Sequence, residues 1–333
     1  MIDFALTRAD TPPQASQQAA ASKTAQQGAD IRFVAGGTTL IDLMKLDVET
    51  PRRVIDINRL ELARTEPQSD GSLRIGAMVR NSDLAQDPNV LRDYPVLSQA
   101  LLSGATGQLR NMATTGGNLL QRTRCQYFRD LSYTQCNKRT PGSGCAALDG
   151  PNRIHAILGT SEHCIATHPS DMAVAMMALD ARIHILGQQG EREIAIGDFY
   201  LLPGSTPNLE NLLKPGDLIT HVTLPPLASG TRSHYLKLRD RASYEFALAS
   251  AAVVVQAEGG RIRKARIAFG GIGTRPWRSP EAERALEGKA VHEATFRAAA
   301  DAALRNAKPQ RDNAFKVELA KRCLVRALTT VTA

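Results

Sequence analysis

The sequence IRFVAGGTTL, which runs from Ile31 to Leu40, decides the fold of the first part of the chain. Three of its first four residues are apolar, which is typical of a short buried strand, and a glycine pair follows at positions 36 and 37. A helical pattern then covers residues 40–46, and a second buried strand covers residues 54–57. This alternation of strands and helices predicts an α/β unit whose glycine turn leads from strand to helix.

The pattern beyond this unit divides the chain into two domains. Residues 62–79 are typical of a hairpin, and residues 170–179 are typical of a helix. Near residues 225–230 the pattern changes to strand-like runs followed by three helical stretches, which indicates a separate α+β domain. We therefore expect a first domain over residues 1–229, with parts at about 1–59 and 60–229, and a second domain over residues 230–333.

Composition argues against several classes of protein. The net charge is +8, but only 5% of residues are aromatic and no basic run is long enough for a nucleic-acid-binding arm. No run of about eighteen apolar residues occurs, so we expect no membrane span. The N-terminus lacks a basic segment followed by an apolar one, so we expect no signal peptide of its own. A nucleic-acid partner is likewise not expected.

Two glycine-rich loops have similar chemistry, at residues 35–39 (AGGTT) and 113–118 (ATTGGN). Paired glycines bring backbone N–H groups close to a ligand, and threonine hydroxyls add donors, so each loop can bind a phosphate. A single Gly-Gly pair is more often only a tight turn, but two such loops fit the pyrophosphate of a dinucleotide. Neither a Walker A motif nor Gly-x-Gly-x-x-Gly after a strand is present, which argues against a P-loop or Rossmann site.

A cysteine-rich stretch interrupts the regular pattern at about residues 121–165. The spacings of its four cysteines lack the Cys-x-x-Cys pairs of structural zinc sites and thioredoxin-like centres. Irregular spacing suits an iron–sulfur cluster that is wrapped by a turn-rich loop. Reduced cysteines or two disulfides in a surface loop stay open as alternatives, and nearby histidines are alternative ligands. The cysteines are Cys125, Cys136, Cys145 and Cys164, and the histidines are His155, His163 and His168.

Basic residues accompany these cysteines. A cluster held by four thiolates is negatively charged, so nearby cations and N–H donors would stabilise it and adjust its reduction potential. The basic residues expected to have this role are Arg122, Arg124, Arg129, Lys138 and Arg139.

The two glycine loops together make the sequence recognisable. Residues 32–40 and 113–118 resemble the FAD-binding signature of the xanthine dehydrogenase and carbon monoxide dehydrogenase flavoproteins. Ser170-Asp171 and residues 235–239 (YLKLR) resemble further motifs of that family. The resemblance covers essentially the whole chain. It implies an α+β fold with a two-part FAD-binding α/β domain of the PCMH type, like that of vanillyl-alcohol oxidase, and a C-terminal domain of the carbon monoxide dehydrogenase flavoprotein type.

The resemblance also implies a role for each matching residue. Asp171 would contact the ribose region of FAD, and Lys237 would lie near the isoalloxazine ring; a helix N-cap and a surface lysine are the structural alternatives. The residues expected to contact the pyrophosphate are Arg32, Phe33, Val34, Ala35, Gly36, Gly37, Thr38, Thr39 and Leu40. Those expected to complete the phosphate and ribityl contacts are Thr114, Thr115, Gly117 and Asn118.

The cysteine-rich insertion resembles that of one branch of the family. Most flavin subunits of xanthine dehydrogenases lack it, but the FAD subunits of bacterial periplasmic aldehyde oxidoreductases carry a similar insertion with a [4Fe–4S] cluster. The matching stretches are residues 121–125, 136–139, 141–145 and 164–171. The resemblance thus implies that Cys125, Cys136, Cys145 and Cys164 are the ligands. Cys323 matches no ligand position and is expected to be a buried, inert thiol.

By this resemblance the chain would transfer electrons. A large partner subunit with a molybdenum cofactor would oxidise an aldehyde, a small [2Fe–2S] subunit would pass the electrons on, and FAD in this chain would deliver them to an external acceptor. The complex would be heterotrimeric and periplasmic, exported with a signal-bearing partner; a cytoplasmic location is the alternative. Three alternative hypotheses remain. The chain could be a flavin subunit like that of hydroxybenzoyl-CoA reductase, a self-sufficient oxidase of the vanillyl-alcohol type, or a non-catalytic scaffold cross-linked by zinc.

Overall fold

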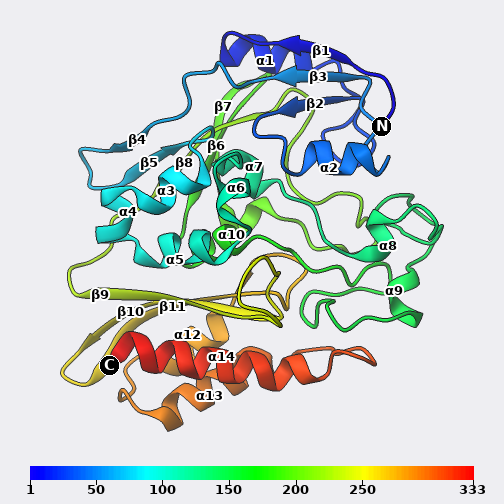
Figure 1. The fold of residues 1–333 in the computed structure, drawn as a ribbon. Coiled ribbons are helices and arrows are strands. Elements are labelled where there is room, and N and C mark those ends of the chain that lie inside the picture. The colour runs from blue at the N-terminus through cyan, green and yellow to red at the C-terminus, as the bar shows by residue number, and fades with distance from the viewer.

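The computed structural model describes all 333 residues and contains three sheets, with helices packed on and between them (Figure 1). The N-terminal unit is a parallel sheet in the order β1-β3-β2. Its elements are β1 (Ala5–Arg8), α1 (Pro12–Ala19), β2 (Ile31–Val34), α2 (Leu40–Lys45) and β3 (Arg53–Asp56). Thr11 caps α1 by accepting a hydrogen bond from the Gln14 N–H. The predicted α/β unit is therefore present, with the first glycine loop between β2 and α2.

A five-stranded antiparallel sheet follows, in the order β4-β5-β8-β6-β7. Its strands are β4 (Thr65–Pro67), β5 (Leu73–Gly76), β6 (Arg182–Gly187), β7 (Gly190–Ala195) and β8 (Leu218–Leu224). The helices that accompany it are α3 (Asn81–Gln86), α4 (Pro88–Asp93), α5 (Pro95–Ser103), α6 (Gly107–Arg110), α7 (Thr115–Leu119), α10 (Asp171–Ala178) and α11 (Ile196–Phe199). Strand β8, which the sequence patterns did not predict, lies between β5 and β6 and joins the predicted hairpin, β4-β5, to the pair β6-β7 in one sheet.

The C-terminal sheet is antiparallel, in the order β12-β11-β10-β9, and three helices cover its outer face (Figure 1). The strands are β9 (Thr231–Leu238), β10 (Ala249–Glu258), β11 (Arg261–Gly270) and β12 (Trp277–Arg278), and the helices are α12 (Pro280–Leu286), α13 (Glu293–Leu304) and α14 (Phe315–Thr332). Along β10, Ala251 and Val253 pack against the helices, whereas Ala252 and Val254 belong to the core around α5 and α10. The sheet is thus buried on both faces, which explains the continuous apolar run of β10.

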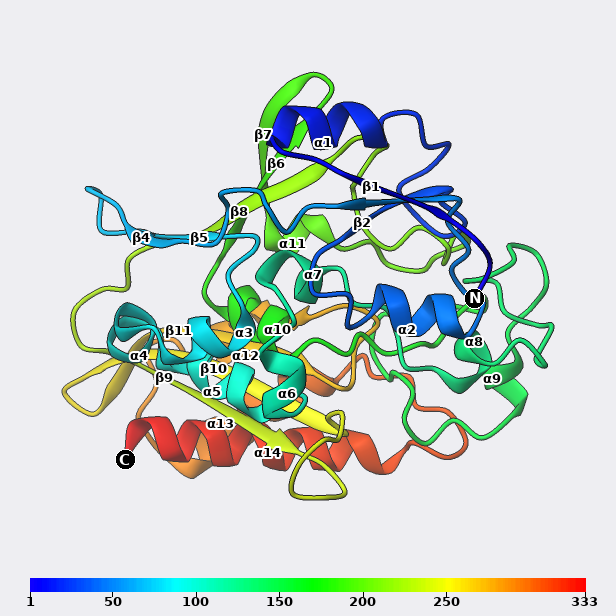
Figure 2. The same ribbon diagram turned by 45° about the horizontal axis from the view of Figure 1, so that its top comes forward.

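The cysteine-rich insertion is irregular apart from two short helices, α8 (Gln126–Arg129) and α9 (Ala146–Asp149). Figure 2 shows α8 beside α2 of the N-terminal unit. From the other side, α14 contributes Lys316, which is fully buried and donates to three backbone carbonyls. The acceptors are Ile154 at 2.9 Å, His155 at 3.0 Å and Gly271 at 2.7 Å. The C-terminal domain therefore holds the end of the insertion in place.

Cys323 lies in α14, where its side chain is fully buried among apolar neighbours. Burial raises the pKa of this thiol to about 12, so it stays protonated, as expected for an inert thiol. None of the helices combines the length and the apolar character needed to cross a membrane.

Replacing Lys316 with methionine should destabilise the chain by about 2–4 kcal/mol, because three buried carbonyls would each lose a donor. The loss should appear in urea unfolding, and also as faster proteolytic cleavage within residues 150–156. Lys321→Met on the same helix is the matched control, since that side chain is partly exposed and pairs only with the exposed Asp301. Equal stability of the two variants would contradict this role of Lys316.

Candidate functional site

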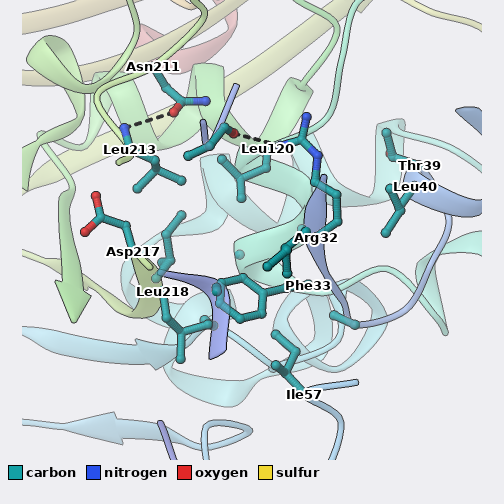
Figure 3. Close-up of a pocket in the computed structure, with 18 of the residues that line it drawn as sticks. Arg32, Phe33, Thr39, Leu40, Ile57, Leu120, Asn211, Leu213, Asp217 and Leu218 are labelled. Carbon is teal, nitrogen blue, oxygen red and sulfur yellow. Dashed lines mark hydrogen bonds between the residues drawn. The ribbon is translucent and has the colours of Figure 1, made fainter. Parts of the chain in front are cut away.

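The two glycine loops line one cavity, as the sequence predicted. The cavity contains about 1330 Å³ of empty space, part of which is open solvent. Its walls come from the N-terminal unit, from α7 and from the segment that leads into β8. Figure 3 shows Thr39 and Leu40 of the first loop on one side and Leu213, Asp217 and Leu218 on the other, with Arg32 and Phe33 between them.

The first loop exposes a row of backbone donors. None of the N–H groups of residues 36–40 donates to a protein acceptor, although all five residues line the cavity. Gly37 has a φ of +72°, a conformation that favours glycine. At Gly36, a Cβ atom would overlap the carbonyl oxygen of Met112, which lies just before the second loop. Glycine at position 36 therefore lets the two loops meet, and the free N–H groups form an anion-binding concavity.

The second loop offers fewer donors, because α7 begins within it. Thr114 is the N-cap and its hydroxyl oxygen accepts from the Gly117 N–H at 3.3 Å, which leaves the hydroxyl proton free for a ligand. The N–H groups of Thr115 and Gly116 donate to the carbonyls of Val79 and Ala77, which lie directly after β5. Asn118 accepts through its side-chain oxygen from Ser170 and Gln121, so its amide protons stay free. This loop therefore supplies side-chain donors rather than a row of backbone groups.

Arg32 lines the cavity, but its guanidinium group is used within the protein. It pairs with Glu49 at 2.9 Å and donates to the carbonyls of Ala25 and Gln26 at 2.7 and 2.6 Å. The Gln26 side chain in turn donates to the carbonyl of Asn211 at 3.1 Å. Arg32 thus holds the loop after α1 in place as one wall of the cavity. Gln26 joins this wall to the segment that precedes β8.

Ten of the fifteen predicted cofactor-binding residues line this cavity: Arg32, Phe33, Ala35, Gly36, Gly37, Thr38, Thr39, Leu40, Thr114 and Gly117. Val34, Thr115, Asn118, Asp171 and Lys237 are not among its lining residues. Thr115 is fully buried and its hydroxyl donates to the carbonyl of Val79, so its side chain supports the loop instead.

Asp171 and Lys237 form a buried ion pair at the junction of α10 and β9. Their charged atoms are 2.7 Å apart, and the two side chains are only 10% and 3% exposed. The Tyr235 hydroxyl donates to Asp171 at 2.5 Å, and Lys237 also donates to the carbonyl of Ser103 at 3.1 Å. Asp171 borders a second cavity, which it shares with Cys125 and the loop after β9. The structure therefore brings these two predicted residues together, but away from the glycine loops.

The four insertion cysteines converge on one small cavity, which all of them line. None forms a disulfide. Burial raises the pKa of Cys125 to about 12, that of Cys164 to about 11, and that of Cys145 above its ordinary value. No group of three or more His, Cys, Asp or Glu side chains is arranged to hold a metal ion. The structure thus brings the predicted ligands together without forming the geometry of a single-ion site.

Backbone N–H groups face the sulfur atoms in this cavity. Cys125 and Cys145 directly precede α8 and α9, and nearby backbone N–H groups lower the pKa of both thiols against the effect of burial. The N–H of Ala166 donates to Cys164 at 3.5 Å. Donors in these positions stabilise thiolates, which is the state that binds metal.

The predicted role of the basic residues needs correction, because protein carboxylates and carbonyls already bind most of them. Arg124 and Arg129 pair with Asp42 of α2, and Arg122 pairs with Glu49 and Glu210. Arg139 donates to backbone carbonyls of the insertion, the first two being those of residues 127 and 128. Lys138 pairs with Glu210 at 2.7 Å, and its charge also lowers the pKa of Cys164 against the effect of burial. Ion pairs hold the insertion to the N-terminal unit, and mainly N–H groups face the cysteines.

The three histidines of this region differ in their surroundings. His163 is exposed, His155 is buried, and His168 is half-buried with its Nε2 atom fully covered. Burial lowers the pKa of the His155 and His168 imidazoles to about 4, so both are neutral at pH 7. His168 accepts from the Ser170 N–H at 3.3 Å and packs edge-on against Tyr200. His155 approaches Cys125.

The comparisons with known proteins agree with this geometry. Residues 7–227 match the FAD binding domain in molybdopterin dehydrogenase, and residues 234–331 match the CO dehydrogenase flavoprotein C-terminal domain. The chain belongs to the family of FAD-binding medium subunits of the xanthine dehydrogenase and CO dehydrogenase type. It is therefore a subunit of an oxidoreductase of the molybdenum hydroxylase family. The resemblance and the fold class inferred from the sequence are confirmed.

Individual relatives extend this result. The chain is 51% identical to the aldehyde oxidoreductase FAD-binding subunit PaoB of Escherichia coli, over 100% of this chain and 99% of that protein. It is 28% identical to the carbon monoxide dehydrogenase medium chain of Hydrogenophaga pseudoflava, over 92% and 91% of the two chains. A solved structure of carbon monoxide dehydrogenase from the same organism matches with a TM-score of 0.77 and 26% identity, and covers 100% of this chain and 99% of that one.

Sequence reasoning missed the far wall of the cavity. It is formed by residues 210–219, which include Asn211, Leu213, Asp217 and Leu218. This stretch has neither strand nor helix periodicity before β8, and its residues match no motif for nucleotide binding. The only usable signal was Lys214-Pro215-Gly216-Asp217, which indicates a turn but not what the turn faces.

Gly36→Ala should separate the two loops, because the new methyl group would overlap the Met112 carbonyl. We expect roughly tenfold or greater weakening of FAD retention, equivalent to about 1.4 kcal/mol, as measured by fluorescence of FAD released on dilution. Gly107→Ala is the matched control, since a Cβ there would meet no atom within 4 Å. Retention of FAD by Gly36→Ala at the level of the control would contradict the close approach of the loops.

His168→Asn should make the stability of the full chain less sensitive to acid. The folded pKa of about 4 lies below the ordinary value of 6.5, so between these values the unfolded chain binds a proton that the folded chain does not. Stability therefore falls as the pH falls through this window. Between pH 6.5 and 5 the unsubstituted chain should lose about 2 kcal/mol more than the variant, measured by urea unfolding. Asparagine keeps an acceptor for the Ser170 N–H.

The control for this pH effect is His292→Asn, since exposed His292 makes the same type of bond to a backbone N–H, that of Ala294. It should leave the pH dependence unchanged. A parallel shift of the two variants would show that His168 is not the group responsible.

Proposed function

We propose that this chain is the FAD-carrying, electron-transferring subunit of a molybdenum-dependent aldehyde oxidoreductase. The observation that carries the proposal is the 51% identity, over the whole length, to the FAD-binding subunit of an aldehyde oxidoreductase. The partners would be a large subunit with the molybdenum cofactor and a small subunit with [2Fe–2S] centres. No residue of this chain needs to contact the aldehyde. A periplasmic location would depend on a signal-bearing partner.

The cavity between the glycine loops fits FAD. The free N–H groups of residues 36–40 would bind the pyrophosphate, and the Thr114 hydroxyl and the Asn118 amide would donate to phosphate or ribityl oxygens. Apolar side chains at the other end of the cavity, including Phe33 and Leu213, would pack against a flat ring (Figure 3). The contact of Asp171 with the ribose region and the position of Lys237 near the isoalloxazine ring stay predictions, since neither residue lines this cavity. When bound, FAD supplies two-electron chemistry that can proceed in single-electron steps.

The cysteine cavity fits an iron–sulfur cluster better than a single zinc ion. Zinc needs about four ligands at about 2.0–2.3 Å from one point. In a [4Fe–4S] cluster each thiolate binds a different iron, so the four sulfur atoms surround a cube instead of meeting at one ion. Four cysteines around one cavity, with N–H groups facing their sulfur atoms, match the second arrangement. We propose Cys125, Cys136, Cys145 and Cys164 as the ligands.

The route of the electrons follows from these assignments. The small subunit would deliver electrons to FAD in this chain, and an external acceptor would remove them. The similarity to the aldehyde enzyme, which covers the whole chain, favours this function over that of a hydroxybenzoyl-CoA reductase.

The test is an anaerobic count of iron, acid-labile sulfide and FAD in the purified complex. Cys136→Ala should lower both iron and sulfide by about four per complex while the [2Fe–2S] signals remain. Cys323→Ala is the control, since this buried cysteine lies in a different core, and it should change neither count. Equal iron content in the two variants would overturn the cluster assignment. A complex without FAD would overturn the flavin assignment.

A further inference from the structure

His155 is the only side chain that forms a hydrogen bond with the sulfur atom of one of the four insertion cysteines. Its Nε2 atom lies 3.1 Å from the sulfur of Cys125, thirty residues earlier in the chain. The imidazole is buried, and its ring lies 6.0 Å from that of Tyr127. The other sulfur contacts in the cavity come from the backbone. Cys125 is therefore the one insertion cysteine whose sulfur has a side-chain hydrogen-bond partner.

We propose that His155 donates its Nε2–H to the Cys125 thiolate and thereby raises the reduction potential of the iron–sulfur centre. It is a positioning residue, since it acts through a ligand. The inference rests on the cluster assignment made above. It adds to that assignment a specific side chain that sets the electronic properties of the centre.

The chemistry of the pair fixes the tautomer of the ring. A cysteine that binds iron is a thiolate and has no proton to give, so the imidazole must be the donor at Nε2. Nδ1 of the neutral ring is then a bare acceptor. This agrees with the surroundings of Nδ1, which is buried and has no hydrogen-bond partner. A proton at Nδ1 would leave a buried donor unsatisfied there and two acceptors facing each other at Cys125.

The C-terminal domain holds this imidazole in place through the backbone of His155. The His155 carbonyl accepts from Lys316 at 3.0 Å and from Asn313 at 3.2 Å, and its N–H donates to the Asn152 carbonyl at 3.1 Å. All three partners are buried. The distance to the sulfur is therefore set by rigid structure rather than by a mobile side chain.

The direction of the effect follows from charge. Reduction adds an electron to a centre that is already negative, and a donor at a ligand sulfur stabilises the added charge. Loss of the donor should therefore make reduction less favourable. Only a proline substitution removes a backbone N–H, and proline also restricts the backbone, whereas this side-chain donor can be removed by itself.

The experiment compares three variants of the full complex by redox titration followed with electron paramagnetic resonance. His155→Leu removes the donor, and it should lower the ratio of reduced to oxidised centre at a fixed potential by roughly tenfold, which is about 59 mV for one electron. His155→Gln keeps an N–H at a similar position and should restore most of this loss. His292→Leu, at an exposed histidine outside the insertion, should behave like the unsubstituted protein.

A second measurement needs no substitution, which guards against a His155→Leu protein that does not fold. Pulsed resonance on the reduced unsubstituted complex, labelled with ¹⁵N-histidine, should detect a weakly coupled histidine nitrogen. Absence of this coupling, or an unchanged potential in His155→Leu with full iron content, would overturn the role of His155 and leave the cluster assignment intact. Absence of about four extra irons from the unsubstituted complex would overturn the cluster assignment and this role together.

Discussion

The close approach of the two glycine loops is the constraint on which the cavity depends. Gly36 lies so near the Met112 carbonyl that any side chain would force the N-terminal unit away from the segment that precedes α7. The first loop belongs to the unit with the three-stranded sheet, and the second to the part with the five-stranded sheet. The two loops are about eighty residues apart in the chain. Their contact therefore sets the relative position of the two halves. As a consequence of this contact, the backbone N–H groups of residues 36–40 face the cavity and form no hydrogen bonds with neighbouring backbone.

A chain of buried charges extends this contact from the cavity to the cysteines. Arg32 pairs with Glu49, Glu49 with Arg122, Arg122 with Glu210, and Glu210 with Lys138. Burial alone would raise the pKa of Glu210, but Arg122 and Lys138 outweigh it and lower the pKa to about 2. The carboxylate is therefore charged at any physiological pH, and the alternation of signs keeps each charge compensated. Arg32 and Arg122 line the flavin cavity, whereas Lys138 lines that of the cysteines, so one network fixes both.

The sequence predicted the elements with strong local signals. Strands β2 and β3 and the glycine loops follow from short apolar stretches and turn residues, and all are present. Strand β8 was missed because its neighbours β5 and β6 are distant in the chain, and only their pairing makes it central. The basic residues of the insertion were assigned to the cysteines because the sequence does not show which carboxylates lie nearby. Asp42, Glu49 and Glu210 come from other parts of the chain, and only the fold brings them together.

A sequence boundary near residue 230 is not a boundary in the packing. Tyr235, Ala252 and Val254 from the C-terminal sheet belong to the same buried core as residues of α5 and α10. Peeling this sheet away would expose apolar surface on both sides and would break the Asp171–Lys237 pair, which crosses the junction. The C-terminal domain also reaches the insertion through Lys316. It therefore acts as a rigid base: one face of its sheet supports the flavin-binding part, and α14 holds the end of the cysteine-rich loop. Residues 7–227 and 234–331 match two different family domains, but buried residues of both regions pack together in the same cores.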